Sequence, residues 1–156
     1  MMPFYLFRCL TPKGSYRYML YYMREVERMK IYLASPLFTE YERESVRMWA
    51  KQLRSEGNEV YVPMEHQIKN AWDMPNNEWA YKVFQEDIKA IDESEMLVVL
   101  YYGLYSDSGT AWEQGYAYAK GKQVQVINMG CIEASLMVVN GQTYSDSKEF
   151  AEVAQT

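Results

Sequence analysis

The sequence predicts an α/β protein built on a three-layer, doubly wound (flavodoxin-like) parallel sheet of about five strands. Short apolar runs that suit buried strands alternate along the chain with longer amphipathic runs that suit helices. The run EMLVVLYYG, residues 95–103, is apolar without alternation, as expected for a central strand covered on both faces. Because neighbouring parallel strands need crossover helices, this order places helices on both faces of one sheet.

The first strand and the first helix are predicted between residues 30 and 57. Residues 30–35 form a short apolar run that ends before Pro36. Thr39, followed three residues later by Glu42, makes a capping box, and the amphipathic run that follows stops at Gly57. The apolar positions at helical spacing predict the buried face of this helix, which consists of Val46, Trp49, Ala50 and Leu53.

The middle of the chain predicts a second strand, a long loop and a second helix. Residues 59–63 form the strand, and residues 64–77 form a loop marked by Pro75 and two asparagines. A helix is expected over residues 78–94, before the central strand. Its apolar side chains, in approximate register, are Trp79, Val83, Ile88 and Ile91.

A third helix is expected within DSGTAWEQGYAYAKGK, residues 107–122, beginning near residues 108–110. Small residues recur every four positions in this helix and predict a stripe that packs closely on the sheet. The stripe consists of Ala111, Gly115 and Ala119.

The end of the chain predicts two strands and a closing helix. Residues 123–128 form the fourth strand, and the apolar run in residues 135–141 is a possible fifth. Residues 147–154 are expected to be helical.

Residues 1–28 differ in charge from the rest of the chain. They contain five Lys and Arg against two Glu, a balance of +3, so the whole chain's net charge of -5 leaves -8 for the remainder. The segment lacks the apolar core and cleavage site of a secretory signal. Because Met29 directly precedes the first strand, we expect residues 1–28 to be an accessory or misassigned start and residues 29–156 to be the domain. A helical arm that packs on a neighbour is the alternative.

Composition excludes several classes of function. A length of 156 residues suits one domain, and the net charge of -5 argues against a nucleic-acid partner. No apolar run approaches the ~20 residues of a membrane span. Cys9 and Cys131 form neither a disulfide framework nor a metal-like spacing, which fits the reducing cytoplasm. Fifteen Tyr and four Trp favour a ring-lined pocket or a subunit interface, although core packing also explains them.

Ligands of doubly wound sheets bind beyond the carboxyl ends of the strands. This predicts a crevice formed by the loops after Ser35, Pro63, Gly103 and Asn128. The first loop has no Gly-rich phosphate motif, and His66, the only histidine, has no nucleophile elbow or metal cluster near it in sequence. We therefore expect neither a cofactor nor a metal.

Glu113 is the most conspicuous polar residue of the predicted crevice. It lies about one turn into its helix, where the helix dipole favours a negative charge by ~0.3–1 kcal/mol. An ionised acid at this place suits nucleophilic attack or the stabilisation of a cation, although acids in first turns are also common without any function. Tyr32, Gln67 and Asp87 converge on the same end of the sheet, and each has a purely structural explanation too.

Four segments together resemble the nucleoside 2-deoxyribosyltransferases in order and spacing, over roughly residues 30–140. They are IYLASPLF, YVPMEHQ, QEDIKAIDESEMLVVL and, above all, DSGTAWEQGYAYAKGK. The last matches the family pattern D-x-G-[TL]-x-x-E-[LIQ]-G-Y-A, which is much more specific than a lone glycine motif.

The resemblance implies a role for each matching residue. Glu113 would be the nucleophile that takes the 2-deoxyribosyl group, and Asp87 would handle the proton of the base. Asp107 would lie near the base and the sugar hydroxyls and is the third expected catalytic residue. The expected substrate-binding residues on this chain are Tyr32, Phe38 beside the base, Gln67 facing the base, and Gly109.

The family's neighbouring subunit donates an Asn-Leu-Met segment to the site, and this chain has Ser135, Leu136 and Met137 there. The resemblance therefore implies a homo-oligomer, a dimer or a trimer of dimers, with Ser135 and Met137 binding substrate across the interface. A serine hydroxyl is shorter than an asparagine amide, so the 5′ contact is expected to differ. The tail also lacks the aromatic end of some members.

The favoured hypothesis is transfer of a 2-deoxyribosyl group between nucleobases in nucleoside salvage, through a covalent glycosyl-enzyme on Glu113. The substrates would be 2′-deoxynucleosides and free nucleobases. The nearest alternative is hydrolysis of 2′-deoxynucleoside 5′-monophosphates by an N-glycosidase of the same fold. A non-catalytic nucleotide-binding module is the third hypothesis.

Overall fold

The computed structural model describes residues 28–129, 136–139 and 143–146. Its sheet has five parallel strands in the order β2-β1-β3-β4-β5. This is the flavodoxin-like order, so the predicted fold class is confirmed. The strands are β1 (Lys30–Ala34), β2 (Glu59–Tyr61), β3 (Met96–Tyr101), β4 (Gln123–Asn128) and β5 (Thr143–Asp146).

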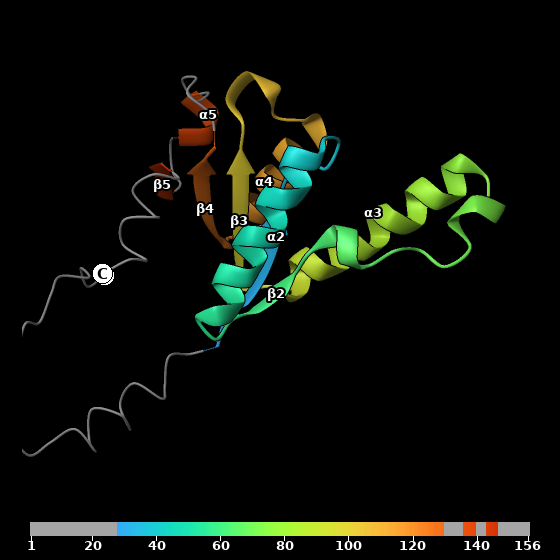
Figure 1. Ribbon diagram of the computed structural model, residues 1–156, viewed down its shortest axis with the longest axis horizontal. Helices are drawn as coiled ribbons and strands as arrows, with labels where there is room; N and C mark the ends of the chain where they lie inside the picture. Colours follow the sequence, from blue (N-terminus) through green and yellow to red (C-terminus); the bar gives the residue numbers. More distant parts are fainter. Residues whose placement is uncertain (1–27, 130–135, 140–142, 147–156) are drawn as a thin grey trace, which may run out of the picture.

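Helices cover both faces of the sheet (Figure 1). Successive residues of a strand point to opposite faces, so Ile31 and Leu33 join one core cluster and Tyr32 and Ala34 join the other. The first cluster contains the predicted buried face of α2, which is thereby confirmed, and the second contains residues of α3 and α4. The helices are α2 (Glu40–Ser55), α3 (Asn76–Glu93), α4 (Ser108–Ala119) and α5 (Leu136–Val139), with 3-10 turns η2 (Pro63–Glu65), η3 (Ala71–Asp73) and η4 (Gly103–Tyr105).

Helix α3 packs on the sheet only near its carboxyl end. Ala90 and Ile91 are its buried residues, and its amino-terminal part extends away from the sheet (Figure 1). Trp79, one of the apolar residues expected in register on this helix, is 44% exposed. The rings on this part of α3 therefore face a groove and solvent rather than the core.

The small-residue stripe predicted for α4 is wrong. Thr110, Gln114 and Ala117 are the buried residues of this helix, whereas the stripe residues are exposed. An added Cβ at Gly115 would meet no atom within 4 Å. A stripe of small residues does not tell which side of a helix faces the sheet. Here the side that contains Ala117 faces it, because Ala117 packs in the second core cluster.

The possible fifth strand at residues 135–141 is also wrong. Leu136–Val139 form the short helix α5, and the fifth strand is β5, which pairs with β4. An apolar run this short fits a buried helical turn as well as a strand, and Val138 packs against the second core cluster.

Two further expectations lie outside the described residues, namely the nature of residues 1–27 and the closing helix at 147–154. Within the described part of the chain, no helix is both long and apolar enough to cross a membrane.

Candidate active site

A cavity of about 530 Å³ lies at the carboxyl ends of the first three strands. The loops after β1, β2 and β3 line it, together with α3 and α4, so three of the four predicted loops meet there. The expected site residues on its wall are Phe38, Gln67, Asp87, Asp107, Gly109 and Glu113.

Asp107 caps α4 at the edge of the cavity. Its carboxylate accepts a hydrogen bond from the Thr110 amide, so Ser108 is the first helical residue. Glu113 is therefore the sixth residue of the helix and lies in the second turn, not in the first as the sequence had indicated. Because the dipole acts mainly within the first turn, it has little influence on Glu113.

The Glu113 carboxyl binds Tyr32, a fully buried residue of β1. The Tyr32 hydroxyl donates a 2.7 Å hydrogen bond to Oε1 of Glu113. Burial raises the pKa of Glu113 to about 7, with the Tyr32 hydrogen bond opposing the rise and the charges of Asp87 and Asp107 adding to it. At neutral pH the free site therefore holds Glu113 in both its protonated and its ionised form, and the expectation that it is held ionised stays a prediction for the substrate complex.

Tyr32 is not part of the cavity wall, although it was expected to bind substrate. Burial and the charge of Glu113 raise its pKa far above the ordinary value, so the hydroxyl remains a donor. Tyr32 therefore acts on the site through its hydrogen bond to Glu113.

Asp87 is the second carboxyl group near Tyr32. Burial raises its pKa to about 6, and the charge of Glu86 adds to the rise, whereas the Tyr32 hydroxyl and the charge of His66 oppose it. The pKa values of Asp87 and Glu113, about 6 and about 7, are close, and the charge of Asp87 acts on Glu113, so the two carboxyl groups share protons as a pair.

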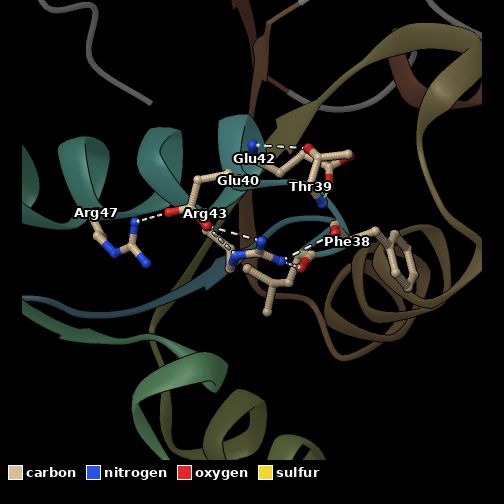
Figure 2. A network of polar contacts seen from close by, with 7 residues as sticks. Phe38, Thr39, Glu40, Glu42, Arg43 and Arg47 are labelled. Carbon is tan, nitrogen blue, oxygen red and sulfur yellow. Dashed lines mark hydrogen bonds and ion pairs between the residues drawn. The ribbon is translucent and has the colours of Figure 1, made fainter.

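Phe38 stands at the mouth of the cavity on a loop that α2 holds in place. The predicted capping box is confirmed, since Thr39 and Glu42 exchange hydrogen bonds of 2.7 and 3.2 Å. Arg43 donates hydrogen bonds to the carbonyls of Leu37 and Phe38, at 2.8 and 3.1 Å. Figure 2 shows the Phe38 ring pointing away from this network, and the ring is 76% exposed. The backbone of this loop is therefore fixed while the ring is free to contact a ligand.

The ring stack beside the carboxyl pair was not predicted from the sequence. Tyr61 of β2 stacks with Tyr32 and with His66, and Trp72 and Trp79 also line the cavity. The high Tyr and Trp content was the available signal, but it could not place individual rings.

The segment expected from the neighbouring subunit is only partly described. Ser135 lies outside the described residues. Met137, on α5, is 83% exposed and is not part of this chain's cavity. Its role across an interface stays a prediction.

The cavity wall is acidic. Glu86, Asp87, Asp107 and Glu113 line it, and no Lys or Arg belongs to the wall as far as the structure describes it. In the same residues, no group of three His, Cys, Asp or Glu side chains is arranged to hold a metal ion.

The model of one protein family, nucleoside 2-deoxyribosyltransferase, matches residues 31–141. The chain belongs to the nucleoside 2-deoxyribosyltransferase family. A structure of the 2-deoxyribosyltransferase from the psychrotolerant bacterium Bacillus psychrosaccharolyticus is 31% identical, with a TM-score of 0.72, and the match covers 79% of this chain and 90% of that one. The predicted resemblance is thereby confirmed.

Two more distant structures share the nucleoside 2-deoxyribosyltransferase fold. A conserved protein from Enterococcus faecalis V583 is 23% identical with a TM-score of 0.66, over 82% of this chain and 98% of that one. The CMP N-glycosidase BcmB of Clostridium botulinum is 21% identical with a TM-score of 0.55, over 81% and 98%. No curated protein matches the sequence. The family and its structural neighbours thus include both glycosyl-transferring and glycosidase enzymes.

Proposed function

We propose that this protein transfers a 2-deoxyribosyl group from one nucleobase to another, with Glu113 as the nucleophile. The observation that best supports this role is the Tyr32–Glu113 hydrogen bond at the wall of the cavity. It fixes one carboxylate oxygen, Oε1, and leaves Oε2 to attack the anomeric carbon. The family match supports the choice of reaction.

In the first half of the reaction, Oε2 of Glu113 forms a bond to C1′ as the bond between C1′ and the base nitrogen breaks. The sugar ring gains positive charge in the transition state, which a carboxylate stabilises. Asp87 gives its proton to the departing base and is left ionised. The products are a free nucleobase and a glycosyl-enzyme.

In the second half, a different base enters, gives a proton to Asp87, and attacks C1′ with its nitrogen. The bond between Glu113 and C1′ breaks, and the carboxylate is restored. Two displacements at one carbon give overall retention of the anomeric configuration. Asp107 and Gln67 are proposed to bind the sugar hydroxyls and the base.

The acidic wall favours a nucleoside over a nucleotide. A 5′-phosphate would bring a dianion near the four carboxyl groups of the wall, with no Lys or Arg among the described lining residues to pair with it. We therefore propose that phosphorylation of the substrate weakens binding, which argues against the nucleotide-hydrolysing alternative.

We further propose that two copies of the chain complete one site. An apolar groove of about 550 Å³ runs between α3 and α4 and shares Asp87 and Glu113 with the cavity. Phe84 and Trp112, whose rings contact each other in this groove, are about half exposed. A second copy would cover these rings and exclude water from the glycosyl-enzyme, as transfer requires.

The test is incubation of the protein with a 2′-deoxynucleoside, with and without a second free base, followed by chromatography. A new nucleoside that appears only with the second base is the expected result. Free base and deoxyribose in both samples would show a hydrolase instead. The same assay with a 2′-deoxynucleoside 5′-monophosphate distinguishes nucleoside from nucleotide as the substrate.

A further inference from the structure

Tyr61 joins the buried and exposed parts of the site through two near-parallel ring contacts. Its ring centroid lies 5.5 Å from that of Tyr32, at an interplanar angle of 14°, and 4.1 Å from that of His66, at 6°. Tyr32 is fully buried and His66 is exposed. The stack therefore runs from the hydroxyl that binds Glu113 to the surface of the cavity.

His66 is held in this stack by a fixed turn. His66 directly follows η2, in which Glu65 forms a 2.6 Å ion pair with Arg54. Arg54 also donates a 2.8 Å hydrogen bond to the Val60 carbonyl, which ties the turn to β2. The imidazole lines the same cavity as Asp87, and its ring nitrogens form no hydrogen bond within the described residues.

The charged groups around His66 are mostly acidic. Glu65 is adjacent in the chain and is paired with Arg54, and α3 presents Glu86 and Asp87. Lys69 follows His66 by three residues in the same loop. A positive charge on His66 lowers the pKa of Asp87, against the effect of burial. An imidazolium stacked on Tyr61 would also form a cation–π contact.

We propose that His66 is a positioning residue of the site, whose stacked imidazole holds Tyr61 against Tyr32 and whose protonated form stabilises the carboxylate of Asp87. The catalytic use of this coupling rests on the proposed function, whereas the coupling itself does not. The coupling matters where Asp87 changes its charge, and burial raises the pKa of Asp87 to about 6.

The coupling is measured directly because His66 is the only histidine of the chain. Its ring proton resonances give one titration curve by NMR. If ionised Asp87 attracts the imidazolium, Asp87→Asn lowers the midpoint of that curve by about 0.5 pH unit or more. The control is Asp92→Asn, which makes the same change at an exposed position near the carboxyl end of α3, where Asp92 pairs with Lys120. An unchanged midpoint in Asp87→Asn, or an equal shift in the control, would overturn the proposal.

The catalytic use is tested with His66→Phe, which keeps a stacking ring and removes the charge. Without the cation Asp87 keeps its proton to higher pH, so the acid limb of the exchange rate is expected to move up by about 0.5 pH unit. His66→Asn removes the ring as well and is expected to lower turnover at all pH values. A His66→Phe profile identical to that of the wild type would refute the catalytic part. Absence of any exchange in the wild type, with the NMR shift intact, would refute the proposed function and leave the coupled pair standing.

Discussion

The Tyr32 hydroxyl donates a 2.7 Å hydrogen bond to Oε1 of Glu113, although 81 residues separate them in the chain. Tyr32 lies in β1, a central strand of the sheet, and Glu113 lies in α4, which packs over that face. The bond orients a carboxyl group at the cavity wall and favours its ionised form, while burial favours the protonated form. The balance between these two effects sets the pKa of Glu113, from which the expected pH dependence of activity and of stability follows.

Removing the Tyr32 hydroxyl is expected to impair exchange without unfolding the protein. In Tyr32→Phe the ring stack remains, but Glu113 loses its orienting donor and its pKa rises further. A hydrogen bond to a charged group contributes about 1.5–3 kcal/mol, so kcat is expected to fall by roughly 10- to 100-fold. The Tyr32 hydroxyl lowers the pKa of both Glu113 and Asp87, so both limbs of the pH profile should move to higher pH. Tyr118→Phe, on the exposed side of α4, is the matched control. Equal rates for the two variants would argue against a role for this bond.

The dependence of kcat/KM on pH is expected to be a narrow bell. Activity requires one proton on the Asp87–Glu113 pair, and the two groups have pKa values of about 6 and 7. The rate should therefore rise as pH increases through 6 and fall as it increases through 7. Asp87 is the stronger acid in the free site, so the productive form, with Asp87 protonated and Glu113 ionised, is the less populated one. A bound base that accepts a hydrogen bond from protonated Asp87 would favour this form. A rate independent of pH between 5 and 9 would exclude this pair as the acid and the nucleophile.

Glu113 is expected to reduce the stability of the folded protein at alkaline pH. Its folded pKa of about 7 exceeds the ordinary 4.5, so between these values the folded state binds more protons than the unfolded state. Stability therefore falls as pH rises through this window, by on the order of 2 kcal/mol.

Glu113→Gln removes the charge and keeps an acceptor for Tyr32. We expect its melting temperature to exceed that of the wild type by about 5 °C at pH 8 and by little at pH 5, measured by circular dichroism. A variant less stable than the wild type at pH 8 would show that the buried charge is compensated.

The α3–α4 groove is expected to be the subunit interface. Trp112→Glu places a charge among its exposed rings and should shift the protein to a smaller species in analytical ultracentrifugation, with loss of exchange. Met48→Glu, on the exposed side of α2, is the control and should change neither. An unaltered sedimentation coefficient and rate in Trp112→Glu would place the interface elsewhere.

Most of the fold could be predicted from local patterns because its elements are strongly periodic. The capping box of α2 and the buried side of that helix depend on residues close together in the chain. The side of α4 that faces the sheet could not be predicted, because it is determined by the packing of Ala117 against residues far away in the sequence. The short run at Leu136–Val139 was ambiguous for the same reason, since its packing partners lie far away in sequence.

The candidate site, like the fold, could be predicted from the sequence only in part. The specific motif around Glu113 contains three of the expected residues that line the cavity, Asp107, Gly109 and Glu113. Its protonation could not be predicted, because it depends on burial and on a tyrosine from another strand. The position of His66 likewise follows from its stack on Tyr61, which no spacing within the loop reveals.

A covalent bond between Glu113 and the sugar is tested most directly by intact-protein mass spectrometry after rapid quenching. With a 2′-deoxynucleoside and no acceptor base, the intact wild type should gain the mass of one deoxyribosyl group, and proteolytic digestion should locate that mass on the peptide that contains Glu113. Glu113→Gln should gain none and should exchange no base, with its circular dichroism spectrum unchanged. A deoxyribosyl adduct on Glu113→Gln, or base exchange by Glu113→Ala at the wild-type rate, would contradict the account.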